Sequence, residues 1–152
     1  MAIVDGGNRR EFNTGAVRDI ADGKGRCDLL PIKEVACLIE SNVLLMISKF
    51  MDCGDTVLLN KAIRLFCTEN HVDVYTAILE VSKHFEEGCN KYGERNWEKG
   101  IPLHCYIDSA IRHYLKFSRG DTDERHDRAF VWNILCATWT LNHKADCIDI
   151  DF

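Results

Sequence analysis

The sequence predicts an all-α fold, a helical bundle of about five helices in a single domain of residues 1–152. Apolar residues recur at helical spacing in successive stretches between residues 31 and 142, and no stretch shows a clear alternation of the kind that strands need. The two prolines, Pro31 and Pro102, each stand where such a stretch begins, and proline is favoured in the first turn of a helix.

The elements are expected in the following order along the chain. Residues 1–30 are rich in Gly, Asp and Arg, a composition that predicts a loop, and we consider this segment a candidate lid over a site. A helix is predicted from Pro31 to about Met51 and another from Asp55 or Thr56 to about Cys67. Three more are predicted from His71 or Asp73 to about Tyr92, from Pro102 to about Phe117 and from Asp123 to Asn142, before a tail or short strand at Asp146 to Phe152.

Burial can be predicted from the same periodicity. Val74, Ile78, Val81 and Phe85 form one stripe of the helix that ends near Tyr92. The next helix has Leu103, Tyr106, Ile107, Ala110, Ile111, Tyr114 and Leu115 on one side. We expect both stripes to face the core.

Composition excludes several classes of protein. The longest apolar run, Val43 to Ile47, is far too short to cross a membrane, and nothing at the N-terminus resembles a signal peptide. The net charge of −5 and the scattered basic residues argue against polymeric nucleic acid as a partner. The eight cysteines never form a CxxC pair, so we expect free thiols in a reducing compartment, the cytoplasm.

Polar residues form a stripe on three consecutive predicted helices. The stripes are Glu80/His84/Glu87, Asp108/Arg112 with the neighbouring His113, and His126/Asn133. Carboxylates that meet between the helices of a bundle provide the oxygen ligands that Mg²⁺ or Mn²⁺ prefers, and basic residues beside them bind phosphate. For each stripe by itself, a solvated helix face is the commoner explanation.

Several short motifs resemble a known family. Gly15-Ala16-Val17-Arg18-Asp19, Gly23-Lys24-Gly25-Arg26-Cys27-Asp28-Leu29, Arg112-His113, His126 through Trp132-Asn133 and, most specifically, Lys91-Tyr92-Gly93-Glu94-Arg95-Asn96-Trp97-Glu98-Lys99-Gly100 are similar to a phage and prophage family of dATP/dGTP diphosphohydrolases (N-terminal domain type). The resemblance covers residues 12–30 and 77–142 and extends to the all-α, MazG-like nucleotide pyrophosphohydrolases. It implies that residues 77–142 hold the core catalytic helices and that the segment 33–76, which is longer than the corresponding link expected in that family, is a helical insertion. It implies hydrolysis of a deoxynucleoside triphosphate, with a purine preference, in a homo-oligomer (dimer or tetramer), and a location in the host cytoplasm if the protein is phage-encoded.

Individual residues can be assigned to this chemistry. Glu80, Glu87 and Asp108 are the preferred metal ligands, and Glu87 and His126 are the candidate catalytic groups. Phosphate binding is expected from Lys24, Arg26, Lys91, Lys99, Arg112 and His113, and base or sugar recognition from Asn96, Trp97 and Asn133. Trp97 can instead cover a helix end, and His126 can be a core or capping histidine. In many MazG-like enzymes the Asp of an ExxD pattern stands three residues before a Trp; here Ala129 holds that place before Trp132, and Glu124 and Asp127 reproduce ExxD only in a shifted register.

Two other functions are compatible with the sequence. His126-Asp127, together with His84, His104, His113 and Asp146, is the residue set of an HD-type metal phosphohydrolase, which would hold a transition metal through several histidines. A non-catalytic helical protein that binds a partner through residues 33–76 would leave the polar stripes in solvent.

Overall fold

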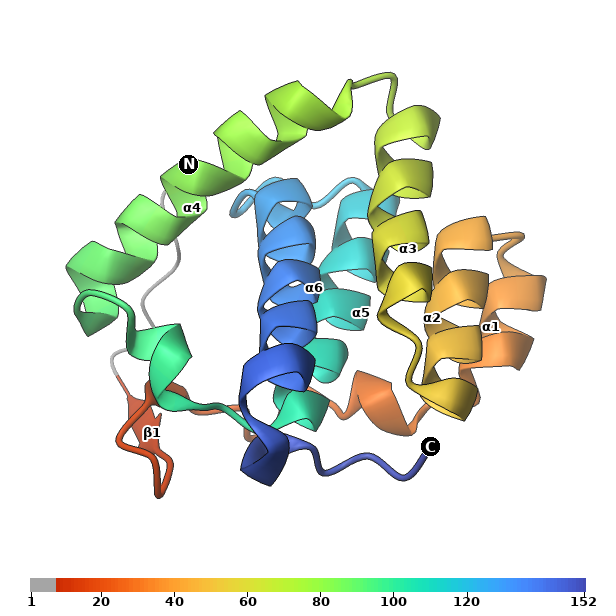
Figure 1. Cartoon of the computed structure of the whole chain (residues 1–152). Helices are drawn as coiled ribbons and strands as arrows, with labels where there is room; N and C mark the ends of the chain where they lie inside the picture. The colour runs from red at the N-terminus through yellow and green to blue at the C-terminus, as the bar shows by residue number, and fades with distance from the viewer. Residues whose placement is uncertain (1–7) are drawn as a thin grey trace.

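The computed structural model describes residues 8–152, and the loop predicted for residues 1–7 lies outside this range. It has six α-helices, α1 (Ile32–Leu38), α2 (Asn42–Cys53), α3 (Thr56–Glu69), α4 (Val74–Tyr92), α5 (Leu103–Arg119) and α6 (His126–His143). Helices α1, α2, α3, α5 and α6 run beside one another, and α4 arches away from them (Figure 1). The all-α prediction is confirmed, and the three core helices lie close to their predicted bounds.

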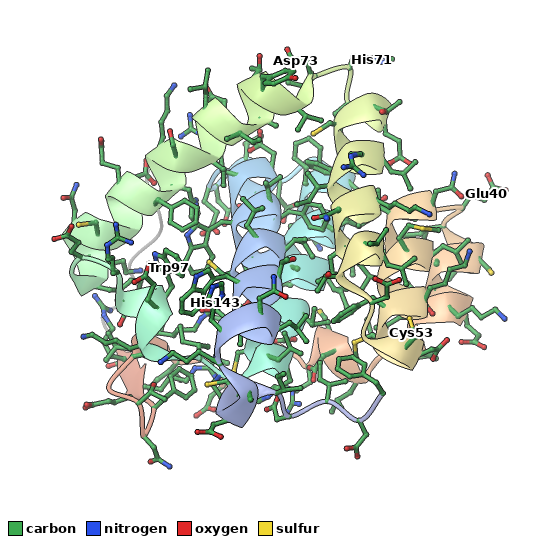
Figure 2. All side chains as sticks on the ribbon, in the orientation of Figure 1. Glu40, Cys53, His71, Asp73, Trp97 and His143 are labelled. Atoms are coloured by element: carbon green, nitrogen blue, oxygen red, sulfur yellow. The ribbon has the colours of Figure 1, made fainter. Side chains whose placement is uncertain are left out.

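A break divides the first predicted helix into α1 and α2. The chain turns at Glu40, whose φ of +54° is left-handed, and the Ser41 hydroxyl then accepts a hydrogen bond from the Leu44 amide over 3.0 Å. This N-cap starts a new helix, although the apolar spacing continues across it. Glu40 lies at the outer edge of the molecule (Figure 2). The single helix predicted from Pro31 to Met51 is therefore wrong.

The core is centred on α5 and α6. The predicted stripe of α5 is confirmed, because Leu103, Tyr106, Ile107 and Ala110 are fully buried. Phe66 of α3 packs against Phe130 of α6, with ring centroids 4.7 Å apart, so the predicted insertion shares the core of the remaining helices.

Helix α4 contributes little to this core. Val81 is its one buried residue, and Ile78 is 51% exposed, so the predicted stripe of α4 is wrong at that position. The reason is geometric: α4 arches away from the bundle, and its second half borders a cavity instead of close-packed side chains. None of the helices in residues 8–152 is both long and apolar enough to cross a membrane.

The N-terminal segment contains an antiparallel hairpin where a loop was expected. Strand β1 (Arg9–Glu11) pairs with β2 (Val17–Asp19), and Arg10 stands opposite Arg18. Gly15, with φ of +87°, provides the left-handed turn residue between them. Three-residue strands are too short to show a period in the sequence, so the loop prediction is wrong for this part of residues 8–30.

The remaining connections are short 3₁₀ helices, η1 (Cys27–Leu29), η2 (Asn96–Lys99) and η3 (Ala145–Cys147). After η3 the chain is extended, without a strand, and Phe152 packs edge-on against Phe50 with centroids 5.3 Å apart. All eight cysteines are free, and Cys67, Cys105, Cys136 and Cys147 are buried. The prediction of unpaired thiols that pack as small hydrophobes is confirmed for these four.

Candidate functional site

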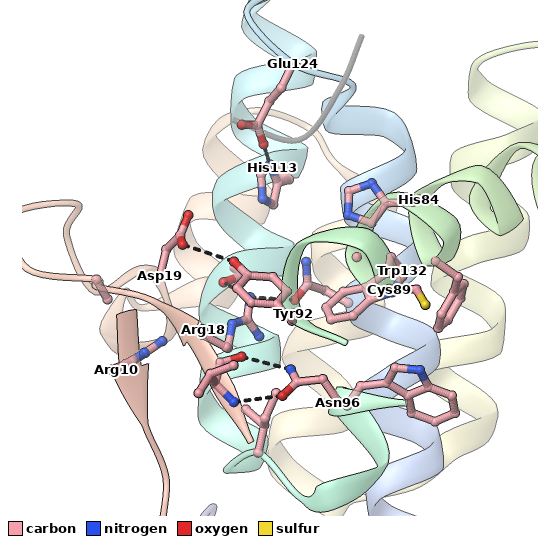
Figure 3. A pocket seen from close by; sticks show the side chains of 18 of the residues that line it. Arg10, Arg18, Asp19, His84, Cys89, Tyr92, Asn96, His113, Glu124 and Trp132 are labelled. Atoms are coloured by element: carbon pink, nitrogen blue, oxygen red, sulfur yellow. Dashed lines mark hydrogen bonds and ion pairs between the residues drawn. The ribbon is translucent and has the colours of Figure 1, made fainter. Parts of the chain in front are cut away.

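A cavity of about 210 Å³ lies where β2 faces α4, α5 and α6 (Figure 3). Each of these elements provides polar groups, including Arg18 from β2, His84 from α4, His113 from α5 and Asn133 from α6. Residues far apart in the sequence meet here because α4 leaves the bundle and the hairpin closes the open side.

The charge of the cavity wall is mainly positive. Its basic side chains are Arg10, Arg18, Lys24, Arg95, Arg112 and Lys116, and its acidic ones are Asp19 and Glu124. This excess of cations contrasts with the net charge of −5 of the whole chain. An anionic ligand is therefore favoured at this point of the surface.

Arg18 is a cation whose position several neighbouring side chains fix. Its Nη2 donates to Ser109 Oγ over 3.1 Å and to Asn133 Oδ1 over 3.4 Å. The guanidinium also lies over the rings of Tyr106 and Trp132, 5.3 and 5.8 Å from their centroids. These contacts hold the guanidinium in one orientation, as a binding group requires.

Some donors on the cavity-lining residues lack a partner. Among the described residues, four buried donors on the cavity lining have no hydrogen-bond acceptor: Arg10 Nε, Arg18 Nη1, Arg112 Nε and Trp132 Nε1. Buried donors are nearly always paired in folded proteins, so each marks a place where an ordered water or a ligand atom is expected. Four such donors favour a ligand with many acceptor oxygens or nitrogens.

The inner wall is aromatic. Trp132 packs near Phe85 and Tyr106, at centroid distances of 5.8 and 5.9 Å. Trp97 meets Phe85 and Trp139 edge-on, between η2 and α6 (Figure 2). Trp97 therefore lines the cavity and also packs against α4 and α6, and its predicted contact with a base stays a prediction.

His84 borders this wall and is largely buried. Burial, followed by the charges of Arg128 and Arg18, lowers the pKa of His84 to about 4. Its imidazole is consequently neutral at pH 7.

Lowering the pH should reduce the unfolding free energy through His84. Because the pKa of His84 is lower in the folded state than its usual 6.5, the unfolded chain binds a proton first as the pH falls. We expect a loss of about 2 kcal/mol in unfolding free energy between pH 6.5 and 5, absent above pH 6.5. Urea unfolding of His84→Gln should show a shallower dependence, and the exposed-site variant His143→Gln should match wild type. An unchanged slope in His84→Gln would contradict the assignment.

Two histidines and a glutamate meet at one end of the cavity. His113 Nδ1 lies 2.9 Å from His126 Nδ1 and 3.5 Å from Glu124 Oε1, and His126 Nδ1 lies 3.8 Å from the same oxygen. Asp123 Oδ1 is 2.7 Å from His126 Nε2. His113 and Glu124 line the cavity (Figure 3), whereas His126 is 1% exposed and is not part of the lining. Burial holds the pKa of His113 well below its usual value.

Asn96 has a structural function that differs from the predicted base recognition. Its amide accepts from the Val17 backbone N–H and donates to the Val17 carbonyl, both over 2.9 Å (Figure 3). It thereby acts as a strand partner for β2. The amide oxygen and the amide nitrogen of Asn96 both have a partner on the Val17 backbone. The prediction that Asn96 reads a base is therefore not supported by these contacts.

Asn96→Ala should release the hairpin. The substitution leaves the Val17 N–H and C=O without partners, so we expect a loss of about 1–3 kcal/mol in unfolding free energy. Amide hydrogen exchange of nucleotide-free protein should be faster at Val17 and Arg18 than in wild type. Exchange that stays at the wild-type rate would show that Asn96 does not anchor the hairpin.

The structure brings together most of the predicted substrate-binding residues. Lys24, Asn96, Trp97, Arg112, His113 and Asn133 line the cavity. Three others do not: Arg26 pairs with Asp28 over 2.8 Å, Lys91 pairs with Asp19 over 2.9 Å, and Lys99 is exposed on η2. Their predicted contacts with phosphate are not supported by this arrangement, because none of the three lines the cavity.

The three predicted metal ligands do not converge. Glu80 Oε2 accepts from Arg128 Nε over 3.0 Å, and Glu87 Oε1 is 4.0 Å from Arg128 Nη1. Asp108 accepts two hydrogen bonds of 2.7 Å from Arg112 Nη2 and one of 2.6 Å from the Cys27 amide. Among the described residues they form no common metal-binding group, so their predicted meeting in one cavity is wrong. Helical spacing places them on faces but does not say which faces meet.

The residues proposed for an HD-type site assemble only in part, because His113 and His126 meet and the others named here have different partners. Asp127 is bound by Arg125 over 2.9 Å, and His104 is bound by Asp149 at the far end of α5. His126 instead meets His113 and Glu124.

The sequence interpretation missed several lining residues as site candidates. Arg18, Glu124 and Trp132 are the most informative of them. Arg18 and Trp132 stand in motifs that carry the family resemblance, and this was the available signal. Glu124 follows a break between two predicted helices, so no helical spacing identifies it as a site residue.

Comparison with known proteins identifies the family. Residues 68–149, which are 82 of the 152 residues, match the family described as dATP/dGTP diphosphohydrolase, N-terminal. The match includes α4, η2, α5 and α6, hence three walls of the cavity, but not the hairpin. Neither the search of curated proteins nor that of solved structures found a match. The chain belongs to the dATP/dGTP diphosphohydrolase N-terminal family.

Proposed function

We propose that the cavity binds a purine deoxynucleoside triphosphate, dATP or dGTP, and hydrolyses it to the monophosphate and pyrophosphate with the help of a divalent metal ion. The observation that carries the proposal is the set of unpaired buried donors on a mainly cationic wall. A triphosphate offers the many acceptor oxygens that such a wall favours. Family membership supports hydrolysis at the level of the reaction class.

The chemistry is an in-line displacement. Water attacks the α-phosphorus, the bond from that phosphorus to the oxygen shared with the β-phosphate breaks, pyrophosphate leaves, and the proton of the water passes to a basic group or to solvent. A divalent ion, Mg²⁺ or Mn²⁺, would neutralise phosphate charge and activate the water. Arg18, Lys24 and Arg112 are placed to bind the phosphates. The catalytic roles of Glu87 and His126 stay predictions.

The aromatic wall supports recognition of a base. Trp132 borders the cavity with an unpaired Nε1–H. An indole face stacks on a purine, and its N–H pairs with a purine acceptor nitrogen or oxygen. Asn133 also lines the cavity, but its amide accepts from Arg18 and donates to the Ala129 carbonyl, so its predicted contact with the base stays a prediction. Arg18 of the hairpin and Lys24 of the loop that follows it would then close over the phosphates as a lid.

Product analysis tests the reaction. Each common nucleoside triphosphate is incubated with the protein and Mg²⁺ or Mn²⁺, and the products are separated. We expect monophosphate and pyrophosphate, faster from dATP and dGTP than from pyrimidine substrates, and no turnover with a chelator. Release of nucleoside and triphosphate, or no turnover of any substrate, would contradict the proposal; the second result would favour a binding protein.

The functional unit is proposed to be a homo-oligomer, a dimer or tetramer. The outer side of α4 exposes Tyr75, Ile78 and Leu79, which are 83%, 51% and 68% accessible and lie at helical spacing on one face. Light scattering should give a mass above 17.4 kDa, which Ile78→Glu together with Leu79→Glu reduces to that of the monomer. The free thiols suit a cytoplasmic location, and the acidic chain suits a small nucleotide in preference to polymeric nucleic acid.

A further inference from the structure

The cluster of His113, Glu124 and His126 is not explained by the packing of the fold. Its three ligand atoms face one another at the wall of the cavity, and all lie within 4.8 Å. From these contacts we propose that the cluster is a mononuclear transition-metal site, His₂Glu in composition, with Zn²⁺, Co²⁺ or Mn²⁺ as its ion.

The separations of the ligand atoms suit one ion. Atoms that lie about 2.0–2.2 Å from a common metal, at angles of roughly 90–110°, are roughly 2.8–3.6 Å apart. The distances from His113 Nδ1 to His126 Nδ1 and to Glu124 Oε1 are 2.9 and 3.5 Å. The third edge, 3.8 Å from His126 Nδ1 to Glu124 Oε1, is a few tenths of an ångström longer. A small rotation of the Glu124 side chain would close it.

Asp123 orients the buried histidine. Its Oδ1 stands 2.7 Å from His126 Nε2, so that nitrogen carries the proton and the Nδ1 lone pair points toward His113 and Glu124. A carboxylate that holds the second ring nitrogen of a histidine is the usual outer partner of a metal ligand, and it fixes the tautomer. When Nε2 of His126 carries its proton, the Nδ1 lone pair of His126 faces Nδ1 of His113 and the carboxylate of Glu124. These three groups then need a proton or a cation between them.

The choice of metal follows from the donor types. Mg²⁺ prefers oxygen ligands, whereas imidazole favours Zn²⁺ and other first-row transition ions. Three protein ligands leave coordination positions open, as in catalytic sites. A second candidate group, Asp121, Asp123 and His126, uses the same histidine through its other nitrogen. Asp121 is already paired with Arg119, and the Asp123 side chain is 62% exposed, so this group is less suited to hold an ion.

The position of the site deepens the proposed function. His113 and Glu124 line the same cavity as Arg18, Lys24 and Arg112. An ion held by them would therefore act as a Lewis acid on the phosphates of a nucleotide bound there. This role rests on the proposed hydrolysis, whereas binding of the ion itself does not.

Calorimetric titration of untagged, chelator-treated protein with ZnCl₂, MnCl₂ or MgCl₂ alone tests the site without substrate. We expect one Zn²⁺ per chain, bound much more tightly than Mg²⁺. Glu124→Gln, which keeps the size of the side chain, should weaken Zn²⁺ binding at least about 100-fold, and Asp123→Asn about 10–100-fold, as for an outer-shell partner. The control variants Glu69→Gln and His143→Gln alter an exposed glutamate and an exposed histidine away from the cavity and should bind Zn²⁺ like wild type.

Cobalt provides a second measurement that does not depend on affinity. Co²⁺ bound to two histidines and a glutamate should give visible absorption bands, which Glu124→Gln alters and His143→Gln does not. No tight Zn²⁺ binding, or binding that Glu124→Gln leaves unchanged, would show that a proton joins His113 and His126 and would overturn the site. Turnover of a triphosphate by protein that does not bind Zn²⁺ at this cluster would overturn the metal site and leave the proposed function. Zn²⁺ binding without turnover of any triphosphate would overturn the proposed function and leave the site.

Discussion

Arg18→Met is expected to lower the affinity for a non-hydrolysable dGTP or dATP about 10–100-fold. Arg18 presents an unpaired, buried Nη1–H from a guanidinium whose orientation is held by Ser109, Asn133 and two aromatic rings. A hydrogen bond between charged groups is worth about 1.5–3 kcal/mol, which corresponds to that loss. Calorimetric titration of wild type and variant measures it directly.

Lys99→Met is the matched control for this experiment. It removes one positive charge from an exposed residue of η2 that does not line the cavity. We expect affinity within about twofold of wild type, because exposed charges contribute little. Thermal denaturation of both variants separates loss of binding from loss of folding. Equal losses of affinity in Arg18→Met and Lys99→Met would show that general charge, and not this cavity, binds the nucleotide.

Asp108→Ala is expected to be the most destabilising substitution considered, at about 3–5 kcal/mol in unfolding free energy. The change leaves the buried Arg112 guanidinium without its carboxylate and the Cys27 amide without its acceptor. Arg112 also donates to the Gly25 carbonyl over 2.6 Å, so the link between α5 and the N-terminal segment weakens as well. Urea unfolding at pH 7 measures the effect.

A surface ion pair provides the control for Asp108→Ala. Asp121 pairs with Arg119, whose side chain is 70% exposed, so Asp121→Ala should cost less than about 1 kcal/mol. Asp108 can be explained as a metal ligand or as the structural partner of Arg112, and the two explanations predict different results. If Asp108 served only to bind a metal ion, its replacement in metal-free protein would lower the unfolding free energy only slightly. A small effect of Asp108→Ala would therefore contradict the structural assignment.

Much of the fold can be predicted from the sequence because helical periodicity is a local signal. The stripe of α5 predicts burial correctly at Tyr106, Ile107 and Ile111, since a helix with one apolar side must pack against neighbours. The break at Glu40 escapes this signal, because the apolar spacing continues through a turn that only the Ser41 cap reveals.

The candidate site depends more on tertiary contacts. The spacing of Glu80, Glu87 and Asp108 predicts helix faces, but the neighbouring arginines, Arg112 and Arg128, bind these carboxylates instead of a shared ion. The hairpin is likewise invisible to periodicity, and it is held by a side chain from η2, Asn96, far along the chain. Lys24 and His113, which are expected to bind phosphate, both line the cavity; the motifs of the family resemblance contain them and add information that spacing lacks.

A crystal structure with a non-hydrolysable dGTP, its bridging oxygen between the α- and β-phosphates replaced, tests most directly whether this cavity is the nucleotide site. We expect phosphate oxygens within hydrogen-bond distance of Arg18 and Lys24, the base against Trp132, and the α-phosphate on the side of His113 and Glu124. A nucleotide bound outside the cavity, in the hollow beside Asp108 and Gly25 or between Glu80 and Arg125, would contradict the account.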